Sequence, residues 1–281
     1  MKTTKRIRTV LYGDQRLSSA ELEVLHTPAM QRLYGLRQLG LADRIFIDAS
    51  HARIHHVVGV LQQVDKLVFA IVNNITRCNR TFRIGASKDN QEIFSANKLA
   101  SFVNKRWPVI RFIGLLHDLT HAPFGHTVED EIRLVGTKHD EPNRQADAFY
   151  RLLCQLIAWL SVEANGPDFK EFPESLKPFL SQGANANLPD PSEVGGLARR
   201  LLTEVDSSKA KACWRLSCQE IAELFAQLRC AMTALLYSEA LHKMELSESD
   251  LPQEEYPFQT AVRIALLGTD FERLLEEFEF Q

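Results

Sequence analysis

Apolar residues recur every three or four positions along much of the chain, a spacing that places them on one face of a helix. Residues 107–121 are almost wholly apolar until a His-Asp pair, which predicts a central buried helix. Residues 145–162 and 219–243 carry further long amphipathic patterns. The clearest stripe lies within residues 54–73 and consists of Val57, Val60, Leu61, Val64, Leu67 and Val68.

Local signals place other helix starts near the N-terminus. Ser18 or Ser19 can cap a helix that begins at Ala20, because a serine hydroxyl accepts a free N–H of the first turn. Pro28 suits the start of the next helix. Alternating strand patterns are scarce, and residues 82–86 are the best candidate for a hairpin strand. The sequence therefore predicts an all-α bundle around an interior helix, with a small hairpin or loop insertion.

Two stretches have the composition of connectors. Residues 164–196 are rich in Pro and Gly, which predicts a long excursion from the core. Residues 245–255 are acidic and polar and precede a short predicted terminal helix. We expect a core unit over residues 1–163, a connector or insertion over 164–198, and C-terminal helices over 199–281 that complete the same domain.

Composition narrows the class of protein. The chain has 281 residues, 45% hydrophobic and 25% charged, with a net charge of -3, so it lacks the basic field of a long nucleic-acid binder. The net charge is still compatible with binding of short DNA or RNA. The sequence contains no apolar run of about eighteen residues, so no membrane span is predicted. The basic N-terminus has no signal-peptide pattern. The five cysteines form no C-x-x-C, which favours buried, reduced thiols in a cytoplasmic protein.

The run LLHDLTHAPFGH, residues 115–126, is the strongest chemical signal. Imidazole and carboxylate together suit a borderline divalent metal. Adjacent helical residues diverge by about 100°, so His117 and Asp118 can reach one ion only at a helix edge or helix end. Pro123 favours such an ending. Two ligands are too few for tight binding, so further ligands must come from elsewhere in the sequence. The run SHARIHHVVGV, residues 50–60, offers three more histidines.

Four runs in this order resemble the motifs of HD-domain phosphohydrolases: TPAMQRLYGLRQLG (27–40), ASHARIHHVVGV (49–60), HDLTHAPFGH (117–126) and KHDE (138–141). The branch they resemble is that of the deoxynucleoside triphosphate triphosphohydrolases related to the sterile-alpha-motif HD-domain enzyme. The resemblance covers the first 150 residues well and the remainder poorly. It implies an HD-domain, phosphodiesterase-like helical bundle.

The resemblance implies a divalent metal held by His56, His117, Asp118 and a later aspartate, Asp206. His55 then lies on a helix face and is not a ligand. Two histidines and two aspartates do not distinguish among Mn, Fe, Mg, Co, Ni and Zn as the bound metal. Three other aspartates are rivals for the last position: Asp147, Asp168 and Asp190.

Acid–base residues are implied beside the metal. Hydrolysis of a phosphoester needs a nucleophilic water, a proton for the leaving oxygen and positive charge near phosphorus. By resemblance, His121 is the acid or the phosphate-side partner, and His126 follows it in a turn. His139 and Asp140 match the family's His-Glu pair, in which the acidic residue orients a histidine. The shorter Asp140 loses one methylene of reach.

Substrate contacts are only partly retained. Gln38 and Leu39 match positions that contact the sugar and base, and Arg53 matches an arginine that meets the phosphates. The family's later sugar-reading aspartate is replaced by Trp214. Candidate replacements for the missing phosphate contacts, or else a solvated helix face, are Lys209, Lys211 and Arg215.

Three functions follow. The first is hydrolysis of a dNTP to deoxynucleoside and triphosphate. The second keeps the metal chemistry but acts as a phosphodiesterase or nuclease on cyclic nucleotides, oligonucleotides or DNA ends. The third is a non-hydrolytic scaffold that binds a nucleotide or a partner protein, against which the intact metal ligands count. Assembly into a homo-oligomer, or with a partner protein, stays open.

Overall fold

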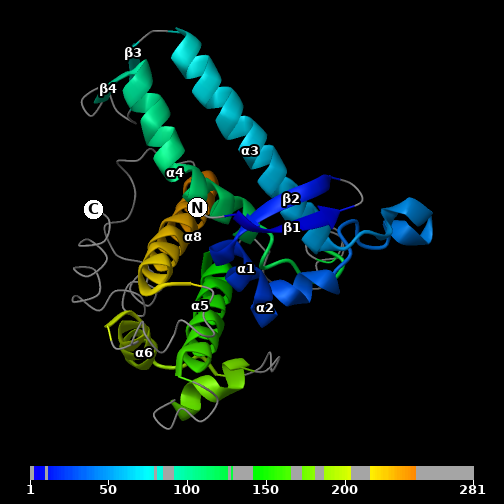
Figure 1. Cartoon of the computed structure of the whole chain (residues 1–281). Coiled ribbons are helices and arrows are strands. Elements are labelled where there is room, and N and C mark those ends of the chain that lie inside the picture. The colour runs from blue at the N-terminus through cyan, green and yellow to red at the C-terminus, as the bar shows by residue number, and fades with distance from the viewer. Residues whose placement is uncertain are drawn as a thin grey trace.

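The computed structural model describes residues 3–9, 12–78, 81–84, 92–125, 128, 142–165, 173–180, 187–203 and 216–244. Helices dominate it, so the all-α prediction is confirmed (Figure 1). Long helices are α3 (Arg53–Cys78), α4 (Ala96–Leu116), α5 (Pro142–Asn165), α6 (Pro191–Thr203) and α8 (Cys218–Met244). Shorter ones are α1 (Ser19–His26), α2 (Pro28–Gln31), η1 (Arg32–Tyr34), η2 (Ala42–Arg44), η3 (Ile47–Ser50) and η6 (Glu174–Leu180).

Two antiparallel hairpins accompany the helices. Strands β3 (Thr81–Ile84) and β4 (Glu92–Ser95) pair where a hairpin strand is predicted. A second hairpin, β1 (Thr3–Thr9) with β2 (Gly13–Ser18), is not predicted from the sequence. Its strand residues are mostly polar and charged, TTKRIRT and GDQRLS, so an alternating pattern is faint.

Ser18 joins this hairpin to α1 as its N-cap. The Ser18 hydroxyl accepts from the backbone N–H of Glu21, and the Glu21 carboxylate accepts from the backbone N–H of Ser18 at 2.8 Å. This capping box satisfies two donors at once. Glu21 is fully buried and also accepts from the Nε of Arg111 on α4, at 2.6 Å. The same carboxylate therefore starts α1 and ties it to the central helix.

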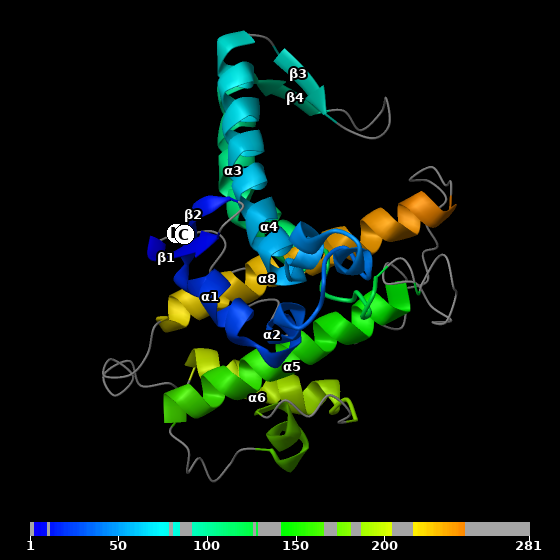
Figure 2. The same ribbon diagram turned by 90° about the vertical axis from the view of Figure 1, so that its right-hand side faces the viewer.

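Helices α3 and α4 form a long antiparallel pair whose outer half projects from the body, with the β3–β4 hairpin at its far end (Figures 1 and 2). A Cβ on Gly114 would meet Val60 Cγ1 at 3.1 Å and Val64 Cγ2 at 3.3 Å, so the helices approach closely there. The predicted stripe is buried except at its edges. Leu67 is 57% exposed on the projecting arm, where α3 packs mainly on α4 among the described elements.

The inner half of α4 is the predicted central helix. Its bounds differ from the prediction: it begins at Ala96, and Trp107, where the buried helix is predicted to start, is 41% exposed. The buried stretch runs from Arg111 to Leu116 and packs against α3 and α8. Helix α5 packs in turn against η6, α6 and α8, which completes the main core (Figure 2).

Parts of the predicted connector lie against the core. Helix η6 and the first turns of α6 both fall within residues 164–198, and each packs on α5. Leu176, Phe179 and Val194 are buried there. These described parts are therefore not an excursion, although the division of the chain into three stretches stays a prediction.

The expectation of buried thiols holds for one cysteine and is wrong for two. Cys154 is buried on α5, and burial raises the pKa of its thiol to about 12. Cys78 and Cys230 are exposed, at the end of α3 and on α8. No described helix is long and apolar enough to cross a membrane.

Candidate metal centre

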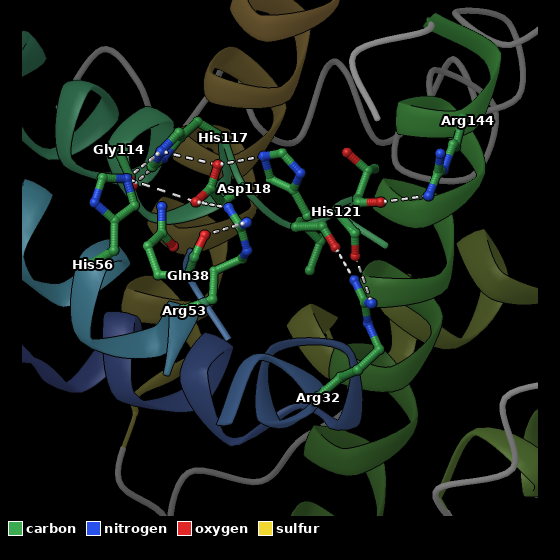
Figure 3. Close-up of polar contacts among 11 residues, drawn as sticks. Arg32, Gln38, Arg53, His56, Gly114, His117, Asp118, His121 and Arg144 are labelled. Atoms are coloured by element: carbon green, nitrogen blue, oxygen red, sulfur yellow. Dashed lines mark hydrogen bonds and ion pairs between the residues drawn. The ribbon is translucent and has the colours of Figure 1, made fainter. Parts of the chain in front are cut away.

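Three predicted metal ligands come together where α3 and α4 meet at the body of the molecule. His56 lies in the first turn of α3, His117 is the C-cap of α4, and Asp118 follows it (Figure 3). Because the two helices are antiparallel, the start of one and the end of the other lie side by side. Because α4 ends at Leu116, the adjacent His117 and Asp118 can face the same point. This agrees with the prediction that the pair lies at a helix end.

The separations of the donor atoms suit one divalent ion. His117 Nε2 lies 3.3 Å from His56 Nε2 and 3.3 Å from Asp118 Oδ1, and His56 Nε2 lies 3.6 Å from Asp118 Oδ2. Ligands about 2.1 Å from an ion are about 3.0 Å apart at octahedral angles and about 3.4 Å apart at tetrahedral angles. The two imidazole nitrogens and the carboxylate oxygens of Asp118 therefore lie close to the separations of ligands around one ion.

Each histidine presents a ring nitrogen suited to a metal. His117 Nδ1 lies 2.8 Å from the backbone carbonyl of Gly114, which can only accept, so Nδ1 carries a proton and Nε2 is the nitrogen that faces His56 and Asp118. Burial lowers the pKa of His56, and the nearby Asp118 charge offsets this only partly. Burial therefore favours the neutral imidazole of His56, which is the form that binds a metal.

Asp118 is buried and held from several sides. Burial alone would raise the pKa of its carboxyl, but the hydrogen bond with His121 and the charges of His117, His121 and Arg53 hold it well below its usual range. His121 Nε2 lies 3.2 Å from Asp118 Oδ1, and Arg53 Nη1 donates to Asp118 Oδ2 at 2.8 Å. The carboxylate therefore stays ionised at neutral pH.

The predicted substrate residues flank this cluster. The backbone N–H of Arg53 donates to the Leu36 carbonyl at 2.7 Å, and that of Gln38 donates to the His51 carbonyl at 3.1 Å, so the two segments pair. The guanidinium of Arg53 contacts Asp118 and the Gln38 carbonyl. Within the described part of the chain, the buried Gln38 Oε1 has no hydrogen-bond partner. Leu39 is 52% exposed.

His121 is brought to Asp118 by a turn that sequence reasoning did not resolve. Arg32 donates to the carbonyls of Leu119 and His121, and Arg144 donates to that of Thr120 (Figure 3). Gly125, with a φ of +52°, closes the turn: a Cβ there would lie 3.1 Å from Arg53 Nη2. Nothing in the sequence distinguishes these arginines from surface ones.

Several predicted residues lie outside the described residues: His126, His139, Asp140 and Asp206, together with Asp168, Lys209, Lys211, Trp214 and Arg215. Of the rivals to Asp206 that are described, Asp147 on α5 and Asp190 before α6 are exposed. Neither belongs to the His56–His117–Asp118 cluster that the structure describes. His55 is exposed, as expected for a residue that is not a ligand.

The chain is similar to several known proteins. The chain is 25% identical over 267 residues to an HD domain-containing protein of Acanthamoeba polyphaga mimivirus, covering 86% of this chain and 56% of that protein. It is 27% identical over 135 residues to the deoxynucleoside triphosphate triphosphohydrolase SAMHD1 homolog of Dictyostelium discoideum, covering 48% and 22%. It is 29% identical over 124 residues to the enzyme SAMHD1 of Homo sapiens, covering 44% and 16%. The chain resembles the HD-domain phosphohydrolases.

The likeness has a limited extent. The chain spans about half the length of the mimivirus HD-domain protein and less than a quarter of either triphosphohydrolase. No protein-family model matches it. The HD-domain likeness therefore extends over more of this chain than the likeness to the triphosphohydrolases.

Proposed function

We propose that this chain is a metal-dependent phosphohydrolase of nucleotides, and that its substrate is a dNTP cleaved to deoxynucleoside and triphosphate. The observation that carries the proposal is the convergence of His56, His117 and Asp118, whose donor atoms all lie within 4.8 Å of one another. The triphosphohydrolases among the relatives support the choice of substrate.

In this proposal His56, His117, Asp118 and Asp206 hold one divalent ion. When bound, such an ion lowers the pKa of a coordinated water and stabilises negative charge on phosphoryl oxygens. In the reaction, the water oxygen forms a bond to the α-phosphorus and the bond from that phosphorus to the 5′-oxygen breaks. The 5′-oxygen leaves with a proton, and the products are deoxynucleoside and triphosphate.

The chain's own residues serve the remaining needs. His121 bonds Asp118 through Nε2, in reach of the same centre, and can hold or give the proton for the leaving oxygen. His126, His139 and Asp140 are proposed to complete proton transfer.

Gln38 and Leu39 are proposed to contact sugar and base, and the buried, unpaired Gln38 Oε1 supports a ligand contact there. Arg53 is proposed to present its fixed charge to the phosphates while holding Asp118.

The test is product analysis with purified, Mn-loaded protein. Substrates are dNTPs, NTPs, cyclic dinucleotides and short DNA, assayed for wild type, Asp118→Ala and the exposed-site control Arg77→Gln. We expect triphosphate and deoxynucleoside from dNTPs, loss of that activity in Asp118→Ala, and no loss in Arg77→Gln.

Other products would change the assignment. Monophosphates released from diesters would identify a phosphodiesterase or nuclease, which the missing triphosphate contacts beyond Asp206 favour. Bound Mn without turnover of any substrate would contradict a hydrolase acting on these substrates and point to a binding scaffold. Manganese content, measured by metal analysis, separates this last outcome from a failure of the metal site itself.

A further inference from the structure

The turn that follows the His-Asp pair is held by two arginines from distant elements. Arg32 of η1 donates from Nη1 to the His121 carbonyl at 2.8 Å and from Nη2 to the Leu119 carbonyl. Arg144 of α5 donates from Nη2 to the Thr120 carbonyl at 2.9 Å. Three consecutive carbonyls are thus bound by guanidinium groups, and we call this set of contacts the arginine clamp (Figure 3).

The clamp lies just beyond the end of α4, whose last residue is Leu116. The carbonyls of residues 119–121 lie outside the helix, so they are not part of its regular hydrogen-bond pattern. Short backbone bonds also order the turn: Leu119 N–H donates to the Leu116 carbonyl at 3.0 Å and His121 N–H to the Asp118 carbonyl at 3.3 Å. The two arginines add contacts from elements that are distant in the sequence.

The two hydrogen bonds of the Arg32 guanidinium constrain the backbone that carries the His121 side chain. Guanidinium nitrogens are coplanar and rigid, so two bonds from Arg32 to carbonyls two residues apart fix both position and tilt of the turn. His121 is buried, with Nε2 3.2 Å from Asp118 Oδ1. Asp118 is held separately by Arg53. Loosening the clamp should therefore move His121 without removing the metal ligands.

The clamp also forms one wall of a cavity of about 590 Å³, lined by Arg32, Arg144, Leu119 and Thr120 among others. Arg32 is exposed and Arg144 is partly buried. Their side chains border open space and are not packed in the core, so replacing them should leave the fold intact.

We propose that Arg32 and Arg144 are positioning residues for His121, acting through the backbone carbonyls of residues 119–121. The inference rests on the proposed function, in which His121 serves the leaving oxygen. Neither arginine touches substrate in this proposal. Each acts by holding the histidine in register with Asp118 and the phosphate.

The first experiment measures steady-state kinetics and bound Mn for Arg32→Gln, Arg144→Gln, Arg32→Lys and the control Arg77→Gln, an exposed arginine at the end of α3. We expect Arg32→Gln to lower kcat by about 10- to 100-fold, because misplacement of a catalytic group by about 1 Å costs up to about 100-fold. Arg144→Gln, which loses one bond, should lower kcat less. KM and Mn content should change by less than about twofold, and Arg32→Lys should recover part of kcat.

The second experiment is a double-mutant cycle with His121→Ala. If Arg32 acts through His121, adding Arg32→Gln to His121→Ala should lower kcat by less than about twofold further. The same loss in both backgrounds would overturn the proposal and indicate that Arg32 acts independently. A rise in KM without a change in kcat would also overturn it, because that result marks a substrate contact.

A third measurement does not depend on activity. Amide hydrogen exchange at Leu119 and His121 in the metal-free protein should be at least about tenfold faster in Arg32→Gln than in wild type, with exchange in α5 unchanged. Unchanged exchange at both amides would show that the clamp does not order the turn. If wild type hydrolyses nothing but exchange responds as expected, the clamp stands and the proposed function fails.

Discussion

Replacing Arg53 with methionine removes a buried cation from a buried carboxylate. Arg53 is 2% exposed and Asp118 is 5% exposed, and a 2.8 Å bond joins them. Removing one partner of such a pair costs about 3 to 5 kcal/mol. The contact between His121 Nε2 and Asp118 Oδ1 remains after the change, so we expect the lower limit, about 3 kcal/mol. The backbone bond from Arg53 to Leu36 survives the change.

The expected loss depends on metal. About 3 kcal/mol corresponds to a fall in Tm of roughly 6 to 12 °C for a chain of this size. A divalent cation bound at Asp118 would replace the missing positive charge, so Mn²⁺ should raise the Tm of Arg53→Met by more than it raises that of wild type. Thermal unfolding followed by circular dichroism, with EDTA or with excess Mn²⁺, measures both values.

Arg111→Met is the matched control. It breaks another buried pair, with the fully buried Glu21, away from the candidate metal centre. This variant should lose a similar amount of stability and gain no extra benefit from Mn²⁺. The reasoning is refuted if Arg53→Met in EDTA unfolds within about 1 kcal/mol of wild type, or if Mn²⁺ helps both variants equally.

Other perturbations test the fold and the site. Ser18→Ala removes the capping box of α1 and should lower the free energy of unfolding, measured in urea, by about 0.5 to 2 kcal/mol. Ser18→Asp should retain most of that free energy. Gly114→Ala places a Cβ 3.1 Å from Val60 and should destabilise by about 1 to 3 kcal/mol; Gly196→Ala on α6, with no atom within 4 Å, should stabilise by up to about 1 kcal/mol. Equal effects of the two glycine changes on the denaturation midpoint would contradict the close helix approach. Because the pKa of His56 is lowered by burial, the unfolded chain binds its proton more readily. The free energy of unfolding is therefore not reduced by His56 above the unfolded pKa of about 6.5. It falls as the pH drops below that value, because the unfolded chain then gains the proton first. The Tm of metal-free wild type should fall between pH 7 and pH 5 more than that of His56→Asn, and parallel pH profiles would count against the burial effect.

Much of the fold follows from local patterns. The apolar stripe in α3, the capping residue Ser18 and the hairpin strand near residue 82 each specify structure over a few turns, and each is found. Boundaries are less well specified. Helix α4 starts eleven residues before the apolar run, because its outer half packs mainly on α3 and carries polar residues on the rest of its surface.

The site is predictable to the extent that its residues are unusual types in a recognisable order. His56, His117 and Asp118 are such residues, and the structure brings them together. Arg32 and Arg144 are not, since arginine is common on helix surfaces and their acceptors are backbone carbonyls, which leave no trace in a sequence pattern. Contacts of this kind depend on tertiary packing between η1, α5 and the end of α4.

The β3–β4 hairpin and the candidate metal centre lie at opposite ends of the projecting α3–α4 arm. Added residues at the hairpin therefore leave the metal centre unchanged. His56 and His117 lie at its base, each about one helical turn from the close contact between Val60 and Gly114. The β3–β4 hairpin lies at the far end (Figure 2). Whole helical turns, or a reporter domain, could be inserted at that end without altering the spacing of the metal-binding side chains. The far end of the arm is accordingly a suitable place for a fluorescent or affinity module while the chemistry of the site is assayed.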